Sequence, residues 1–190
     1  PMTVTVQNAH ARTEIPVKPG MDSVQILPEG ESLVHLEGIS HLITNLDQPT
    51  GARLNAISDM EQRKSEVIKI LTEAGLTHKA ASGVMVVGQH ADGKLRLDPY
   101  VYVRDTGSLY YETGCGSGST AVGLSLSART GLPVTGLEIM QPSGLSLSVT
   151  IERTGSAFKQ AFVNGPIEVV YDDALYLPRR IADHSPTLDI

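Results

Sequence analysis

The sequence contains a single cysteine, Cys115, and a glycine stands on each side of it. The surrounding segment reads Tyr-Glu-Thr-Gly-Cys-Gly-Ser-Gly-Ser over residues 111–119, and the small residues after it predict a helix from about 119 to 128. Glycines let a backbone turn tightly and let a ligand approach its N–H groups closely. The first turn of a helix offers unpaired N–H donors and a partial positive charge, so this segment predicts an anion-binding site.

A cysteine at the start of a helix is suited to acid–base chemistry. The field of the helix N-terminus favours thiolate over thiol, so the sequence predicts that the pKa of Cys115 is depressed. A carboxylate bound to the backbone of Gly116, Ser117, Gly118 and Ser119 would place its α-carbon beside the sulfur. That arrangement suits removal of a proton next to a carboxylate, the step that a racemase needs. The alternative is an inert cysteine, because free cysteines are often buried as small hydrophobic residues.

Two other side chains are candidates for the same site. Glu112 lies three residues before Cys115, where it could bind a substrate ammonium group, orient the thiol, or be a surface carboxylate. His41 follows a predicted strand and could either contact the site or have a structural role. The other histidines lack the spacing of metal ligands, and one cysteine excludes a multi-cysteine metal site, so no metal is predicted.

The elements that must position these residues are mainly strands. Alternating apolar residues punctuated by glycine or proline predict about nine or ten strands. A longer helical pattern covers residues 58–74, and with the helix after Cys115 it makes two helices. The pattern predicts an α+β fold with a mostly antiparallel sheet over residues 1–178, followed by a polar, mobile tail over residues 179–190.

Composition excludes several classes of protein. The chain has 190 residues with 15 Lys and Arg against 21 Asp and Glu, a formal charge of −6, and no clustered basic run, so a nucleic-acid partner is not expected. No apolar stretch is long enough for a membrane span. The single cysteine rules out an internal disulfide, and we expect a cytoplasmic protein.

The box Gly-Cys-Gly-Ser-Gly-Ser at residues 114–119 resembles the second catalytic motif of the diaminopimelate-epimerase-like superfamily, which contains cofactor-independent amino-acid racemases and epimerases. Four weaker resemblances follow the order of the family's motifs, and the likeness covers roughly residues 3–177. They are Gly-Ile-Ser-His at 38–41, Ala-Ser-Gly-Val-Met at 81–85, Gln-Pro-Ser-Gly-Leu at 141–145 and Asn-Gly-Pro at 164–166.

The resemblance implies one lobe of a two-lobed fold, a mostly antiparallel sheet wrapped around a central helix, and specifically the C-terminal lobe. It implies an amino-acid substrate, no cofactor, and a two-cysteine mechanism in which Cys115 is one of two acid/base groups. The residues implied to bind substrate are Gly116, Ser117, Gly118, Ser119, Glu112 and His41. The other lobe and its cysteine have no counterpart here, so we expect a missing N-terminal lobe, a partner chain or a homodimer.

Two departures from the family pattern concern the substrate. Ile39 and Ala81 stand where the family has asparagines, so diaminopimelate is not expected as the substrate, and the pattern is more similar to the histidine racemases of the superfamily. The alternative function is a non-catalytic module that binds an amino acid or carboxylate and has lost the second base. An allylic isomerisation that uses a carboxylate is a more distant option.

Overall fold

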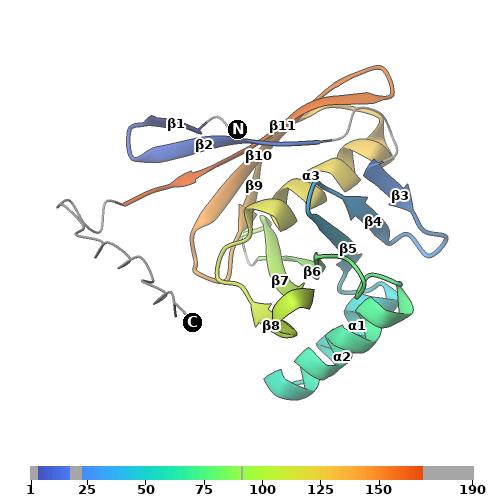
Figure 1. Cartoon of the computed structure of the whole chain (residues 1–190). Helices are drawn as coiled ribbons and strands as arrows, with labels where there is room; N and C mark the ends of the chain where they lie inside the picture. The colour runs from blue at the N-terminus through green and yellow to red at the C-terminus, as the bar shows by residue number, and fades with distance from the viewer. Residues whose placement is uncertain (1–3, 18–22, 91, 169–190) are drawn as a thin grey trace, which may run out of the picture.

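The computed structural model describes residues 4–17, 23–90 and 92–168 (Figure 1), so the predicted tail 179–190 lies outside the described residues. Within these ranges, eleven strands form one sheet, three α-helices pack on it, and a 3-10 turn spans Arg104–Thr106. The helices are α1 (Pro49–Asn55), α2 (Met60–Glu73) and α3 (Gly116–Thr130). The strands are β1 (Val4–Gln7), β2 (His10–Ile15), β3 (Val24–Ile26), β4 (Ser32–His35), β5 (Ile39–Asn45), β6 (Ala81–Gln89), β7 (Leu95–Val103), β8 (Ser108–Tyr111), β9 (Val134–Met140), β10 (Ser146–Thr154) and β11 (Ala157–Pro166).

The sheet runs in the order β1-β2-β11-β10-β9-β7-β6-β5-β4-β3, with β8 paired to β7. The pairs β5–β6 and β7–β9 are parallel, and the other pairs are antiparallel. The sheet curves around α3, which contacts strands from both halves of that order (Figure 1). The predicted α+β class, with a mostly antiparallel sheet around a central helix, is confirmed.

Helix α3 is buried because its small residues let the sheet approach it from several sides. Its buried residues are Gly118, Ser119, Thr120, Ala121, Val122, Gly123, Leu124, Ser125 and Ser127. At Gly123 an added Cβ would lie 2.7 Å from the Cγ1 of Val149, so the close approach of α3 to β10 requires glycine there. The helix begins at Gly116, three residues earlier than predicted, because the glycines of the cysteine box form its first turn.

Helices α1 and α2 cover the opposite face of the sheet (Figure 1). The sheet has a hydrophobic core on each face, and alternate residues of β6 point into one core or the other. Met85 belongs to the core around α3, whereas Val84 and Val86 belong to the core beneath α2. Helix α1 was not predicted, because seven residues are too few to show a helical period. The buried carboxylate of Glu31 stabilises its first turn by accepting a hydrogen bond from the Thr50 amide at 2.9 Å.

Within the described ranges, no helix is both long enough and apolar enough to cross a membrane.

Candidate active site

Cys115 is the N-cap residue of α3, so its sulfur lies at the positive end of the helix. The Sγ atom accepts a hydrogen bond from the amide of Gly118 at 3.3 Å, and only 2% of the residue is exposed. A Cβ added at Gly118 would lie 3.0 Å from this sulfur and 2.3 Å from the sulfur of Met85. Glycine at position 118 is therefore what lets the thiol lie directly against the first turn.

The four residues after Cys115 do not contribute equally to an anion site. The amide of Gly118 donates to the sulfur, and the amide of Ser119 donates to the Cys115 carbonyl at 3.0 Å. The Ser119 hydroxyl donates to the same carbonyl at 2.7 Å, so both residues stabilise the turn itself. In the described part of the chain, the amides of Gly116 and Ser117 have no hydrogen-bond partner. These two amides are the donors that a carboxylate could use.

Ser117 connects Cys115 to His41, which comes from a distant strand. The Ser117 hydroxyl lies 3.6 Å from the Cys115 sulfur and 3.1 Å from Nε2 of His41 on β5. In the parallel pairing of β5 with β6, His41 lies opposite Gly83, where a Cβ would come within 2.8 Å of the ring. The sequence candidates Cys115, Ser117 and His41 thus form one continuous line of polar atoms.

His41 is fully buried, and burial lowers its pKa to about 3. Its Nδ1 atom has no hydrogen-bond partner among the residues that the structure describes. The imidazole is therefore neutral at ordinary pH, and its only hydrogen bond shown is the one to the Ser117 hydroxyl. The ring nitrogen either donates a hydrogen bond to that hydroxyl or accepts one from it, according to the tautomer.

We predict that the low pKa of His41 makes the protein less stable in mild acid. The unfolded chain binds a proton near pH 6.5, whereas the folded chain resists protonation down to about pH 3. Stability therefore falls as pH drops through this window, by about 2 kcal/mol between about pH 7 and 5. Urea unfolding at several pH values should show this slope, and the His41→Asn variant should lose most of it. The exposed His10 offers the control: a His10→Gln variant that lost the same slope would contradict the assignment.

The sequence predicted a depressed pKa for Cys115, and the structure shows that this prediction is wrong. Burial and the neighbouring Glu112 carboxylate raise the pKa of the thiol to about 12, against the lowering effects of the Ser117 hydroxyl and the Gly118 amide. The helix N-terminus does act on the sulfur, but a charged thiolate also has to leave water, and that cost dominates here. Cys115 therefore rests as a thiol.

We accordingly expect slow alkylation of Cys115 by iodoacetamide at neutral pH. The rate should begin to rise only above about pH 9, because the thiolate is the reactive form and little of it exists below that value. Glu112→Gln should shift the labelling profile to lower pH, since it removes a negative charge beside the sulfur. A labelling midpoint below about pH 7.5 in the wild-type chain would show that the thiol is better solvated than the structure indicates.

Gln141 is a site residue that sequence reasoning missed. It follows β9, is buried, and its Oε1 accepts a hydrogen bond from the Cys115 amide at 2.9 Å. Its Nε2 donates to the Ser119 hydroxyl and to the Ile139 carbonyl, both at 3.1 Å. The next turn adds a bond from the Ser143 amide to the Thr113 carbonyl at 2.9 Å. Gln141 stands first in the segment 141–145 quoted above, but nothing in that pattern indicates that its side chain turns back to the cysteine.

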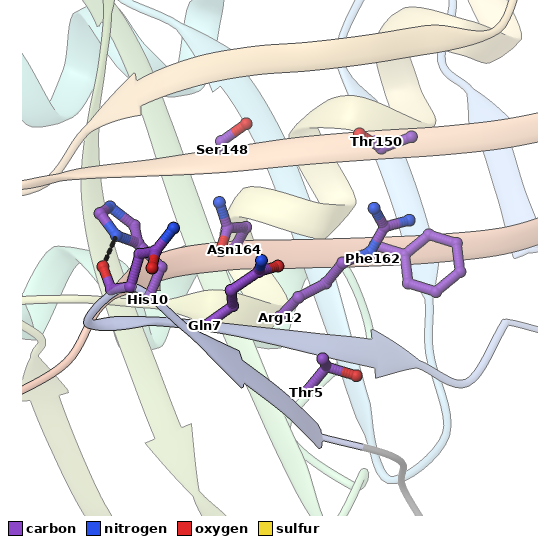
Figure 2. Close-up of a pocket in the computed structure, with 9 residues that line it drawn as sticks. Thr5, Gln7, His10, Arg12, Ser148, Thr150, Phe162 and Asn164 are labelled. Carbon is purple, nitrogen blue, oxygen red and sulfur yellow. Dashed lines mark hydrogen bonds between the residues drawn. The ribbon is translucent and has the colours of Figure 1, made fainter.

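A cavity of about 560 Å³ lies elsewhere, on the outer face of β1, β2, β10 and β11 (Figure 2). It is lined mainly by polar side chains, and the guanidinium group of Arg12 lies 3.9 Å from the centre of the Phe162 ring. Phe162 and Val163 are successive residues of β11, so they point to opposite faces, and only the face of Val163 approaches α3. This cavity is therefore separate from the Cys115 site. Within residues 4–17, 23–90 and 92–168, no group of three acidic, histidine or cysteine side chains is placed to hold a metal ion.

Comparison with solved structures defines the class of fold. A hydroxyproline epimerase from Agrobacterium vitis is similar with a TM-score of 0.53 and 13% identity, covering 87% of this chain and 52% of that one. A probable proline racemase from Agrobacterium radiobacter K84 is similar with a TM-score of 0.52 and 16% identity, covering 87% and 54%. The fold is therefore proline-racemase-like, and it corresponds to about half of each of these two proteins.

Sequence comparison identifies the family. The model of the histidine racemase CntK N-terminal domain matches residues 2–176, and the chain belongs to this family. Two curated histidine racemases, from two strains of Fusobacterium nucleatum subsp. nucleatum, are 28% identical to it over 167 residues. That alignment covers 88% of the chain, which spans 56% of the length of these relatives.

The matched family model is named for an N-terminal domain, whereas the family resemblance implies a C-terminal lobe. The assignment to a C-terminal lobe stays a prediction.

Proposed function

We propose that this chain is one lobe of an amino-acid racemase or epimerase that works without a cofactor, with Cys115 as one of its two acid/base groups. The observation that carries the proposal is the Cys115 thiol at the N-cap of α3, next to the two open amides of Gly116 and Ser117. Membership of the histidine racemase family supports it. An anion on those amides and a proton donor beside it are what proton transfer at a carboxylate's α-carbon requires.

The substrate would be held by its two charged groups. Its α-carboxylate would accept hydrogen bonds from the amides of Gly116 and Ser117, and its α-ammonium group would pair with Glu112. This pairing has a consequence for the thiol, because the Glu112 carboxylate is one cause of the high pKa of Cys115. A bound ammonium group would offset that negative charge and lower the pKa. Substrate binding would thus bring the thiol closer to the range in which it can exchange a proton.

Inversion needs a base on one face of the α-carbon and an acid on the other. The base breaks the Cα–H bond and takes the proton, while the electron pair stays on the α-carbon and spreads into the carboxylate. The acid then gives a proton to the opposite face of the α-carbon. The base ends the step neutral, and the acid ends it negatively charged. Cys115 rests as a thiol and is therefore the donor in one direction of the reaction. The residue opposite it would be a second thiolate, supplied by another lobe, by a partner chain or by a second copy of this chain.

Histidine is the substrate that we propose. The curated relatives are named histidine racemases, and this chain has Ile39 and Ala81 where the resemblance expects amide side chains for a polar distal group. A site built to bind a polar group discriminates strongly when the partners for that group are absent. Diaminopimelate, with its charged distal end, should therefore bind less well than histidine.

The test is exchange of the α-proton for deuterium in D₂O, measured by NMR on a panel of L-amino acids that includes histidine, proline and diaminopimelate. We expect exchange to be fastest with histidine. Faster exchange with diaminopimelate would show that the substrate assignment is wrong, and the absence of exchange with every amino acid would contradict the catalytic role. The buried, protonated state of Cys115 favours a second candidate, a carboxylate-binding module without catalysis. Binding detected by thermal shift without any exchange would support that module.

A further inference from the structure

The strands β1, β2, β11 and β10 carry a row of polar side chains on the face that lies away from α3. The pairing register places one residue of each strand in this row, in the order Thr5, Arg12, Asn164 and Ser148. Residues opposite one another in antiparallel strands point to the same face, so the four side chains are neighbours. All four line the cavity of about 560 Å³, which has the volume of a small-molecule site (Figure 2).

Arg12 is the only permanently charged side chain that lines this cavity, and the described residues do not neutralise it. Every other arginine within residues 4–17, 23–90 and 92–168 donates a hydrogen bond to a protein oxygen, whereas Arg12 donates none. None of the described residues that line the cavity carries a carboxylate, although the chain has a formal charge of −6. Glu14, two residues along β2, accepts a hydrogen bond from Gln160 instead. A guanidinium group without a protein acceptor indicates an anion as its partner.

The ring of Phe162 holds the guanidinium group of Arg12 at the cavity. The Cζ atom of Arg12 lies 3.9 Å from the ring centre, so the two groups are in cation–π contact (Figure 2). The contact occupies one side of the guanidinium group and leaves its N–H groups available. Arginine uses these N–H groups to bind a carboxylate or a phosphate through two parallel hydrogen bonds.

The neutral side chains of the cavity are also available for a ligand. Among the described residues, the side chains of Gln7, Ser148 and Asn164 have no hydrogen-bond partner. His10 donates its Nδ1 proton to the Asn8 carbonyl at 3.1 Å, because a carbonyl oxygen only accepts, and its Nε2 atom has no partner in the part of the chain that the structure describes. Amide and hydroxyl groups both donate and accept hydrogen bonds, so they suit a ligand that carries hydroxyl groups.

We propose that this cavity binds a small, hydroxyl-rich anion, whose phosphate or carboxylate group pairs with Arg12 and whose hydroxyl groups bond to the neighbouring amide and hydroxyl side chains. The site is independent of Cys115, because Phe162 and Val163 point to opposite faces of β11. A neutral sugar lacks the partner for Arg12, and inorganic phosphate lacks the hydroxyl groups. A molecule that carries both therefore binds more tightly than either.

The test is a titration of the 190-residue chain with glucose 6-phosphate, gluconate, glucose and inorganic phosphate. Calorimetry measures the affinities, and NMR shifts of the backbone amides show where each probe binds. We expect the sugar phosphate or gluconate to bind at least about tenfold more tightly than glucose and inorganic phosphate, because hydrogen bonds to a charged group are strong. The tighter of the two identifies the anionic group. The shifts should lie around Arg12 and Asn164 and leave Cys115 unchanged.

Three variants test the contribution of the arginine. Arg12→Gln removes the charge from an exposed position, so circular dichroism should show an unchanged fold, and we expect binding to weaken at least about tenfold. Arg104→Gln is the matched control, because Arg104 is an exposed arginine that pairs with Asp105 at 2.8 Å in the 3-10 turn after β7. It should bind as the wild type does. Phe162→Leu keeps an apolar side chain but removes the ring, so its affinity should fall between the two.

Four results would overturn the proposal. Equal affinity of Arg12→Gln and the wild type, or an equal loss in Arg104→Gln, would show that Arg12 does not hold the anion. Glucose or inorganic phosphate that binds as tightly as the sugar phosphate and gluconate would show that the ligand class is wrong. Amide shifts confined to the surroundings of Cys115 would place the binding site there instead. Absence of binding by both hydroxylated anions at millimolar concentration would reject the site.

Discussion

Replacing Cys115 with alanine should lower the rate of α-deuterium exchange by about 10²–10⁴-fold, the range that general acid–base catalysis contributes. The thiol lies between the Gly118 amide and the Ser117 hydroxyl, and no other thiol exists in the chain to replace it. Exchange is followed by NMR of the α-proton of L-histidine in D₂O. The fold should survive, because the substitution removes one sulfur atom and opens only a small cavity.

Two further variants distinguish the loss of the thiol itself from a change in the residues around it. Cys115→Ser keeps a small polar side chain but replaces the thiol by a much weaker acid, so we expect it to be almost as inactive as Cys115→Ala. Ser117→Ala keeps the thiol and removes its link to His41, so its exchange rate should fall less than that of Cys115→Ala. Exchange at the wild-type rate in Cys115→Ala would contradict any role of Cys115 in the proton transfer.

The second large effect is expected at Gln141. Gln141→Leu leaves the buried Cys115 amide without its acceptor and also removes the donor to Ser119 and Ile139. An unsatisfied buried donor costs about 1–3 kcal/mol, so we expect the free energy of unfolding to fall by at least that amount. Exchange should fall as well, because the loop that holds the thiol loses its link to the end of β9.

The matched control for this variant is Gln160→Leu. Gln160 is an exposed glutamine on β11 whose side chain bonds to Glu14 at 3.3 Å. Removing it should change stability by no more than about 0.5 kcal/mol. Chemical denaturation followed by circular dichroism measures both variants. Equal stability of the Gln141 and Gln160 variants would show that the buried hydrogen bonds of Gln141 do not hold the cysteine loop.

The strands and the two longer helices could be predicted because their signals are local. Alternation over a few residues indicated most strands, and the 3.6-residue period indicated α2, whose bounds of Met60–Glu73 lie inside the predicted 58–74. The helix begins at Met60 and not at residue 58, because the side chain of Asp59 caps its N-terminus by accepting a hydrogen bond from the Gln62 amide. The parallel pairs β5–β6 and β7–β9 could not be predicted, since a strand's own pattern does not state the direction of its neighbour.

The candidate site likewise combines features that the sequence predicts with features that depend on the tertiary structure. From sequence alone, the glycines around Cys115 determined that the cysteine begins a helix of small residues, because turn and helix preferences are properties of neighbouring residues. Only the tertiary structure decided the state of the thiol, since the strands packed around α3 exclude water and thereby raise its pKa. The contacts of His41 and Gln141 also depend on the tertiary structure, because β5 and the end of β9 approach the cysteine only when the sheet curves around α3.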